Sequence, residues 1–323
     1  MKLGVFTTLL SDRSLEDALR FLHEKGVEAV EIGCGGYPGT AHADPEILLR
    51  DDGKLAEFQA VIKKYEMTIS GLSCHCNPIH PNPEIAHAAD ETLTRAILLA
   101  EKLKVSVINT FSGCPGDHAG AKYPNWVTCP WPDEFQTILQ WQWQEILIPY
   151  WKKKVAFAKA HSVDKIAFEM HPGFCVYNPE TALRLREAVG PELGVNFDPS
   201  HLIWQGIDPV VAIKSLGKAG ALFHFHAKDT KIDRCNTALN GVLDTKPYSD
   251  ELNRSWIFRT IGYGNDASYW KEMISALALV GFDNSLSIEH EDSLMSVNEG
   301  LSKAIDFLNE VLIREKKDAI WWV

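Results

Sequence analysis

The chain has 323 residues, of which 46% are hydrophobic and 23% are charged, and its formal net charge at pH 7 is −11. This acidic balance argues against a nucleic-acid partner, because binding a phosphate backbone needs clustered Lys and Arg. No apolar run approaches the roughly 20 residues of a membrane-spanning helix, so we expect no membrane partner either. The seven cysteines, an odd number spread through a long chain, favour reduced thiols over a disulfide framework. Since the N-terminus fits a first strand better than a signal peptide, we expect a cytoplasmic protein.

The first half of the chain alternates between strand-like and helix-like patterns. Apolar runs predict strands at residues 3–8, 29–36, 68–76 and 105–113. Apolar positions spaced by three and four residues predict the helices that follow them, at residues 14–25, 52–65, 82–103 and 134–161. Residues 114–133 form the longest irregular stretch, and they carry Trp126 and Trp131.

The second half repeats the same alternation four more times. Strands are predicted at residues 165–171, 194–201, 221–229 and 285–292, and helices at 179–189, 209–216, 268–280 and 297–315. Eight such units without a Pro/Gly/Ser-rich linker predict a single domain over residues 1–323, folded as a closed (β/α)₈ TIM barrel in the α/β class. A doubly wound open sheet normally stops at about five or six strands. The active site of a TIM barrel lies at the C-terminal ends of its strands.

The last four predicted strands end in side chains of metal-ligand type. Alternate residues of a strand face the same way, so His224, His226 and Lys228 share one side. The other three strands end in Glu169 and His171, in Asp198 and His201, and in Glu289 and Glu291. Carboxylates placed together repel one another unless a cation holds them. Two Glu, one Asp and one His therefore predict one divalent metal ion, with Mn²⁺ as first choice and Mg²⁺, Co²⁺ or Zn²⁺ as alternatives.

The order Glu, Asp-x-x-His, His-x-His and Glu at these strand ends resembles the xylose isomerase-like superfamily of metal-dependent barrels. The stretch HFHAKD, the Gly-x-Gly stretch at residues 262–264 and the stretch SIEHED carry the resemblance, which covers nearly the whole chain. The superfamily includes ketose 3-epimerases, inosose dehydratases and isomerases, and endonuclease IV. The resemblance implies that His201 contacts the substrate and that the metal ligands are Glu169, Asp198, His226 and Glu289.

A divalent ion that chelates two adjacent oxygens of a polyol ketone polarises the carbonyl and acidifies the neighbouring C–H. Glu169 and Glu289 come from well-separated strands, so one can remove the proton and the other can return it to the opposite face of the enediolate. The result is epimerisation or aldose–ketose isomerisation of a keto-sugar or related polyol. If the second residue instead protonates a leaving hydroxyl or glycosyl group, the enzyme is a dehydratase or lyase acting on an inosose or a 3-keto glycoside.

Two further functions are less favoured by the sequence. An abasic-site endonuclease needs several metal ions and a basic groove, which the net charge of −11 argues against. A sugar-binding barrel without catalytic activity would not need a complete set of metal ligands. A small sugar or polyol is therefore the expected partner, and the aromatic C-terminus could pack on the barrel or on a neighbouring subunit, which leaves a homo-oligomer open.

Several other residues are candidates for contacting the substrate. His75 and His171 could bind hydroxyls or only line the mouth of the barrel, and Trp126 or Trp131 could stack on a sugar ring. Residues 235–261 form a second long segment that brings Arg254 and Arg259 near the seventh strand, and we assign Arg259 to the substrate because arginine forks bind hydroxyls and carboxylates.

Three other positions bear on how the site is built. Ketose epimerases of the superfamily have Arg six residues after the ligand His, where this chain has Ile232, so we expect its substrate recognition to differ from theirs. The two long segments 114–133 and 235–261 predict a substrate larger than a triose or tetrose, such as a hexulose, an inosose or a keto-glycoside. We expect Glu31 to form a polar contact under the site and His224 to support the ligands.

Overall fold

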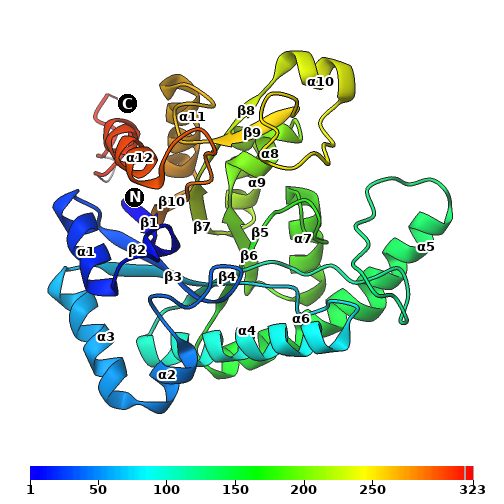
Figure 1. Ribbon diagram of the computed structural model, residues 1–323, viewed down its shortest axis with the longest axis horizontal. Coiled ribbons are helices and arrows are strands. Elements are labelled where there is room, and N and C mark those ends of the chain that lie inside the picture. Colours follow the sequence, from blue (N-terminus) through cyan, green and yellow to red (C-terminus); the bar gives the residue numbers. More distant parts are fainter. Residues whose placement is uncertain (316–317, 323) are drawn as a thin grey trace.

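Eight parallel strands form the centre of the protein in a computed structural model that describes residues 1–315 and 318–322 (Figure 1). Over these residues the strands close into a barrel in the order β1-β10-β7-β6-β5-β4-β3-β2. They are β1 (Lys2–Phe6), β2 (Ala29–Gly36), β3 (Thr68–His75), β4 (Val107–Thr110), β5 (Lys165–Glu169), β6 (Leu193–Phe197), β7 (Leu222–Ala227) and β10 (Ser285–Ile288). The predicted single-domain barrel is confirmed.

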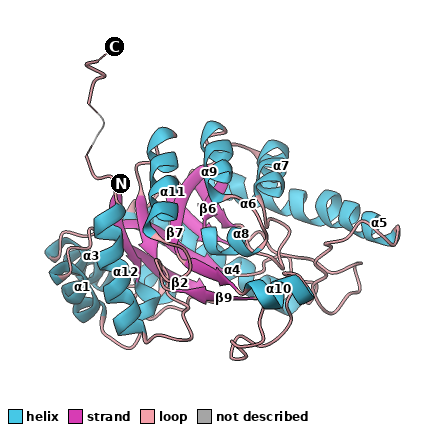
Figure 2. Cartoon of the chain, turned by 90° about the horizontal axis from the view of Figure 1, so that it is seen from above, coloured by secondary structure: helices cyan, strands magenta, loops and turns pink. Residues whose placement is uncertain are grey.

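Helices surround the barrel, as both views of the chain show (Figures 1 and 2). They are α1 (Leu15–Glu24), α2 (Pro45–Arg50), α3 (Asp52–Lys64), α4 (Pro83–Leu103), α5 (Glu134–Trp141), α6 (Ile148–Ala160), α7 (Pro179–Val189), α8 (Pro199–Trp204), α9 (Pro209–Lys218), α10 (Arg234–Asn240), α11 (Ala267–Leu279) and α12 (Val297–Val311), with a 3₁₀ turn η1 (Thr7–Leu10) and a π-helical turn η2 (Gln142–Leu147). Most of them begin at a Ser, Asn or Asp whose side chain accepts a backbone N–H, as Ser14 does from Asp17. Within the described residues no helix combines the length and apolarity that crossing a membrane requires.

The helix predicted at residues 134–161 is interrupted by the π-helical turn η2. Gln142 begins this turn, and its Nε2 donates to the backbone carbonyls of Gly116 at 3.0 Å and Asn125 at 2.7 Å. The irregular segment 114–133 is thereby tied to the helix that follows it. The spacing of apolar residues could not predict this π-helical turn, because the helix continues in the same direction on both sides of it.

The sequence suggested one long loop at residues 235–261, but the structure shows a helix and a strand in this segment. It contains α10 and β9 (Trp256–Arg259), and β9 pairs antiparallel with β8 (Asp229–Ile232). This hairpin lies outside the barrel, beside the end of β7 (Figure 1). At the C-terminus, α12 ends at Val311 rather than at residue 315, and Trp321 and Trp322 are 85% and 71% exposed, so these two rings do not pack on the barrel.

Asp229, the last residue of HFHAKD, contacts the Gly-x-Gly stretch at residues 262–264, which accounts for the presence of both motifs in one chain. Its Oδ2 accepts the backbone N–H groups of Gly262 at 3.2 Å and of Gly264 at 3.2 Å, and also the N–H of Asn265 at 2.9 Å. A Cβ atom at Gly264 would lie 2.6 Å from Cγ of Asp229, so only glycine allows this close approach. The buried carboxylate thus holds the chain between β9 and α11.

Replacing Asp229 by Ala should lower the free energy of unfolding by about 3 kcal/mol or more, because several N–H donors lose their partner in a buried place. Thermal and urea unfolding of the purified variant measure this change. Asp229→Asn, which keeps one acceptor oxygen, should recover part of the loss. A variant Asp229→Ala as stable as the wild type would show that water replaces the carboxylate at no cost.

Candidate metal centre and active site

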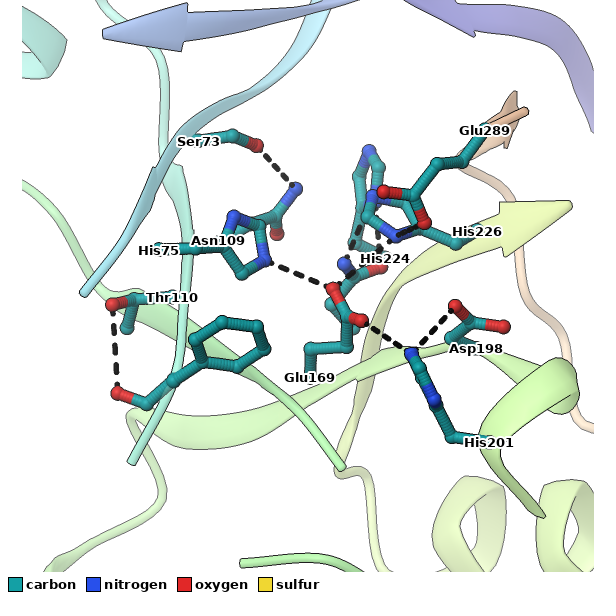
Figure 3. Close-up of polar contacts among 12 residues, drawn as sticks. Ser73, His75, Asn109, Thr110, Glu169, Asp198, His201, His224, His226 and Glu289 are labelled. Atoms are coloured by element: carbon teal, nitrogen blue, oxygen red, sulfur yellow. Dashed lines mark hydrogen bonds and ion pairs between the residues drawn. The ribbon is translucent and has the colours of Figure 1, made fainter. Parts of the chain in front are cut away.

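Polar side chains from four strand ends meet inside the mouth of the barrel (Figure 3). Glu169 ends β5, His226 lies in β7, Glu289 follows β10, and Asp198 follows β6 as the N-cap of α8. One ligand-type atom of each residue lies within 4.8 Å of those of the other three. The side chains of Glu169, Asp198 and His226 are at most 5% exposed, and that of Glu289 is 15% exposed. The four residues that the sequence singled out are therefore neighbours in the fold.

This donor set fits a divalent cation. Oδ2 of Asp198 and Nδ1 of His226 are buried, and within the described residues neither makes a hydrogen bond of ordinary geometry; their polar neighbours are charged groups of the cluster and its surroundings. The other oxygen of Asp198, Oδ1, accepts the N–H of Ser200 at 2.8 Å, which turns Oδ2 toward the cluster. Nδ1 of His226 lies 3.1 Å from Oε2 of Glu289 and 3.4 Å from Oε2 of Glu169. Buried carboxylate oxygens around an imidazole nitrogen are ligands that divalent metals accept.

The surroundings of the cluster keep its carboxylates charged. Burial disfavours the ionised form of Glu169, but hydrogen bonds from His201, His226 and His75 outweigh it and hold its pKa well below the usual value. Burial also opposes ionisation of Glu289, yet the charges of Lys228 and His226 lower its pKa to about 2. Both carboxylates are thus ionised near pH 7, as metal ligands and proton acceptors must be.

Lys228 belongs to the site although the sequence analysis gave it no role. Its side chain is 2% exposed, and Nζ lies 2.8 Å from Oε2 of Glu289, 3.0 Å from Oδ2 of Asp198 and 3.0 Å from Oε2 of Glu291. Burial disfavours its charge, but these carboxylates raise its pKa well above the usual value. The alternation in HFHAKD shows that Lys228 shares a face with His226, whereas its partners come from other strands and meet it only in the closed barrel.

Glu31 lies on the opposite side of the His226 ring from the cluster. It is 0% exposed, and both of its oxygens lie 2.9 Å from Nε2 of His226. Asn109 donates to Oε1 at 2.9 Å, Ser287 donates to Oε2 at 2.6 Å, and Ser73 also donates to Oε1. A carboxylate on the remote ring nitrogen fixes the orientation of a ligating imidazole. Glu31 therefore directs Nδ1 of His226 toward the cluster. The polar contact that we expected for Glu31 from the sequence is this contact with His226.

Glu31, His224 and His226 make up a second group of metal-ligand type. Both ring nitrogens of His224 already have neutral partners, with Nε2 3.1 Å from Oγ of Ser70 and Nδ1 2.9 Å from Oδ1 of Asn196. This second group is better described as a hydrogen-bond network beneath the candidate metal site, and His224 supports it.

Glu31→Gln should weaken the binding of Mn²⁺ by about 10-fold to 100-fold, because the amide holds the ring of His226 less firmly and makes it a poorer donor. Isothermal titration of the metal-free protein measures the affinity. The exposed Glu24→Gln, which removes a carboxylate from the end of α1, is the matched control. An unchanged Mn²⁺ affinity in Glu31→Gln would show that other contacts set the orientation of His226.

The three histidines assigned to the substrate lie at the cluster. Nε2 of His201 is 3.0 Å from Oε1 of Glu169, and Nε2 of His75 is 3.0 Å from its Oε2. His171 lies two residues beyond β5, and burial lowers its pKa to about 3, so its ring is neutral. All three line, together with Glu169 and Glu289, an inner cavity of about 290 Å³.

Trp126 and the two arginines lie farther from the cluster. Trp126 lines a neighbouring cavity of about 360 Å³ with Trp204 and Trp256, whereas Trp131 is 73% exposed. Nε of Arg259 donates to Oδ2 of Asp292 at 3.0 Å, and Arg254 is buried under the hairpin, where its Nε donates to the carbonyl of Trp256.

Neither arginine is among the residues that line the inner cavity, the cavity beside Trp126 or the cavity of about 500 Å³ at the barrel mouth. Their positions along the sequence could not show which way β9 turns its side chains. Substrate contact by Arg259 therefore stays a prediction, and the ion pair with Asp292 favours a structural role instead.

Comparisons with known proteins agree with this fold. A family model described as xylose isomerase-like TIM barrel matches residues 19–311. The uncharacterized protein YfiH of Bacillus subtilis (strain 168) is 38% identical over 314 residues, which cover 97% of this chain and 99% of that protein.

Solved structures show the same architecture at lower identity. The probable 3-DHS dehydratase AsbF of Bacillus anthracis is similar with a TM-score of 0.67 at 18% identity, over 96% of this chain and 99% of that one. The IolI protein, solved with a zinc atom, has a TM-score of 0.65 at 18% identity, over 97% of this chain and 98% of its own. A D-tagatose 3-epimerase-like protein and a D-psicose 3-epimerase also share the fold, with TM-scores of 0.63 and 0.60. The family model matches most of the chain, and a protein of nearly the same length is 38% identical to it. The chain therefore belongs to the family of xylose isomerase-like TIM barrels.

Proposed function

We propose that the protein is a divalent-metal-dependent sugar isomerase or epimerase that acts on a keto-sugar or related polyol through an enediolate. The observation that carries this proposal is that two carboxylates from separate strands lie close to Nδ1 of His226, Oε2 of Glu289 at 3.1 Å and Oε2 of Glu169 at 3.4 Å. They come from β10 and β5, which β7 and β6 separate in the barrel. Two carboxylates from separated strands can reach opposite faces of one bound substrate.

Glu169, Asp198, His226 and Glu289 would hold the metal, with Mn²⁺ as first choice. A divalent ion bound there supplies Lewis acidity toward the substrate carbonyl. A zinc atom in the similar IolI structure and magnesium in a similar barrel from Mycobacterium smegmatis support a divalent cation without selecting one.

The residues of the chain would carry the proton. Glu169, held by His75 and His201, is positioned to accept a proton from the carbon next to the carbonyl. Glu289, at 15% side-chain exposure, is the more open to solvent of the two, so it can take up a proton from water and deliver it to the other face. The ammonium of Lys228 balances the negative charge that the enediolate would add.

A dehydratase or lyase acting on an inosose or a 3-keto glycoside is the second candidate. It would share the first proton transfer, after which the second residue protonates a leaving hydroxyl or glycosyl group. An outer cavity of about 500 Å³ that adjoins the inner cavity favours this candidate, because a leaving group larger than hydroxide needs such room.

The cellular location and the oligomeric state also belong to the proposal. We propose a cytoplasmic location, supported by seven free cysteines, five of them buried.

The exposed Ile320, Trp321 and Trp322 are candidate contacts of a homo-oligomer. Light scattering of the full chain and of a Trp321→Ala, Trp322→Ala variant tests the assembly, and a monomeric wild type would remove it.

The proposed activity can be tested by incubating the manganese-loaded protein in D₂O with ketohexoses, inososes and 3-keto glycosides. Deuterium at the carbon next to the carbonyl, with a new epimer or the isomeric aldose, is the result expected for an isomerase or epimerase. Loss of water or of the aglycone assigns the dehydratase or lyase instead. Tight binding of the sugars with no deuterium uptake in any of them would contradict both candidates.

A further inference from the structure

An outer cavity of about 500 Å³ adjoins the inner cavity of about 290 Å³, which Glu169 and Glu289 of the cluster line. The two cavities share four lining residues, Tyr37, Phe111, His171 and Glu291. A molecule bound at the cluster can therefore extend into the outer cavity while it stays in contact with the protein. The outer volume falls within the range of about 300 to 1,000 Å³ that is typical of pockets for small molecules.

The lining of the outer cavity is mainly aromatic. The rings of Phe111 and Phe174 are stacked, with centroids 4.2 Å apart and planes 17° from parallel. A second stacked pair, Tyr248 and Phe258, has centroids 5.7 Å apart and planes 27° from parallel. The first pair comes from the segments after β4 and β5, and the second from the β8 and β9 hairpin with its connecting segment. Such faces bind flat, apolar groups.

The charge of this lining excludes some ligands. It includes one carboxylate, Glu291, and no Lys or Arg among the described residues. Oε2 of Glu291 lies 3.0 Å from Nζ of Lys228, so that carboxylate already has its cation. A phosphate or carboxylate placed in the outer cavity would meet no arginine fork or lysine to compensate its charge. The polar groups that remain are Ser293, the ring of His171 and the tyrosine hydroxyls.

We propose that the outer cavity binds the flat, uncharged aglycone of a glycoside whose sugar ring occupies the inner cavity; the placing of the sugar ring rests on the lyase candidate of the proposed function. An aryl ring can stack on the exposed faces of this lining and needs few hydrogen bonds. A second sugar would bring several hydroxyls, for which the lining has few partners. A phosphorylated sugar is excluded by the charge of the cavity.

Tyr248 is the best residue at which to test this proposal. This residue is 56% exposed, and it lines both the outer cavity and the neighbouring cavity that Trp126 also lines. The guanidinium of Arg254 lies 4.6 Å from its ring centroid and helps to hold it in place. Because Tyr248 lies on the surface and outside the barrel, its removal should leave the fold intact.

The test compares three glucosides by isothermal titration: 4-nitrophenyl β-D-glucopyranoside, methyl β-D-glucopyranoside and methyl β-cellobioside. The wild type should bind the nitrophenyl glucoside at least about tenfold more tightly than the methyl glucoside, as stacking of an aryl ring implies. Tyr248→Ala and Phe174→Ala should each remove most of this preference. Tyr248→Phe, which keeps the ring, and Tyr123→Ala, which removes an exposed ring elsewhere, should keep it.

Equal affinities for the nitrophenyl and methyl glucosides would overturn the proposal. So would a preference that survives in both Tyr248→Ala and Phe174→Ala, because the aryl ring would then bind elsewhere. Tighter binding of the cellobioside than of the nitrophenyl glucoside would assign the cavity to a second sugar instead. The titrations are repeated on the Asp198→Ala protein without metal. A preference that persists there, in a protein expected to have no turnover, supports the aglycone site even if the proposed chemistry fails its own test, whereas a preference lost there together with the metal would overturn an aglycone site that is independent of the metal.

Discussion

Glu169→Gln and Glu289→Gln should each slow the exchange of the substrate C–H with solvent by about 10³-fold or more. Each carboxylate is expected to be both a metal ligand and the acid or base on one face of the substrate, and a positioned acid or base alone contributes about 10²-fold to 10⁴-fold. The amide side chain of Gln has nearly the same size, so the cavity keeps its shape. Neither amide can accept and return a proton near pH 7.

Deuterium uptake followed by NMR measures this loss, with substrate and Mn²⁺ at saturating concentrations. Glu187→Gln, an exposed change on α7, is the matched control and should keep the full exchange rate. If both active-site variants retained exchange, the base would have to be sought elsewhere. His171 is the next candidate, because its neutral ring lines the same inner cavity.

Asp198→Ala should abolish tight metal binding, the second large effect that the site predicts. The variant lacks Oδ2, which is buried and faces the other three candidate ligands. The metal would lose one anionic ligand, and Lys228 would lose one of the carboxylates around it. Elemental analysis of the purified protein measures the metal directly.

Thermal unfolding with and without Mn²⁺ gives an independent measure of the same effect. A ligand at about 1,000 times its Kd stabilises the folded wild type by about 4 kcal/mol, and this gain should be absent from Asp198→Ala. Asp208→Ala is the matched control, because Asp208 is also the N-cap of a helix but lies away from the cluster. It should cost about 1 kcal/mol through the lost cap and keep the full response to metal. A full equivalent of metal in Asp198→Ala would show that the ligand assignment is wrong.

The order of the elements and the class of fold could be predicted from the sequence because both depend on short-range patterns. Apolar runs followed by helical spacing recur eight times, and a barrel is the arrangement that buries such strands under one layer of helices. The residues that end β5, β6, β7 and β10 could be grouped for the same reason. Parallel strands of one barrel all end at the same rim, so side chains placed last in each strand become neighbours.

Contacts between distant segments were decided only by the tertiary structure. Glu31 and His226 are 195 residues apart in the chain, and they meet because β2 and β7 face the same barrel interior. The three carboxylates around Lys228, those of Asp198, Glu289 and Glu291, come from other segments of the chain and contact it only in the closed barrel. The hairpin of β8 and β9 escaped prediction because its pairing brings Asp229 opposite Arg259 across a long connection, and local apolar spacing does not show which distant segments pair.

The direction of Arg259 and the aromatic lining of the outer cavity depend on how that hairpin folds over the mouth of the barrel. The sequence by itself therefore determined the barrel and the composition of its candidate metal site. The tertiary structure decided what orients the site and what surrounds it, because those contacts exist only once the sheet has closed.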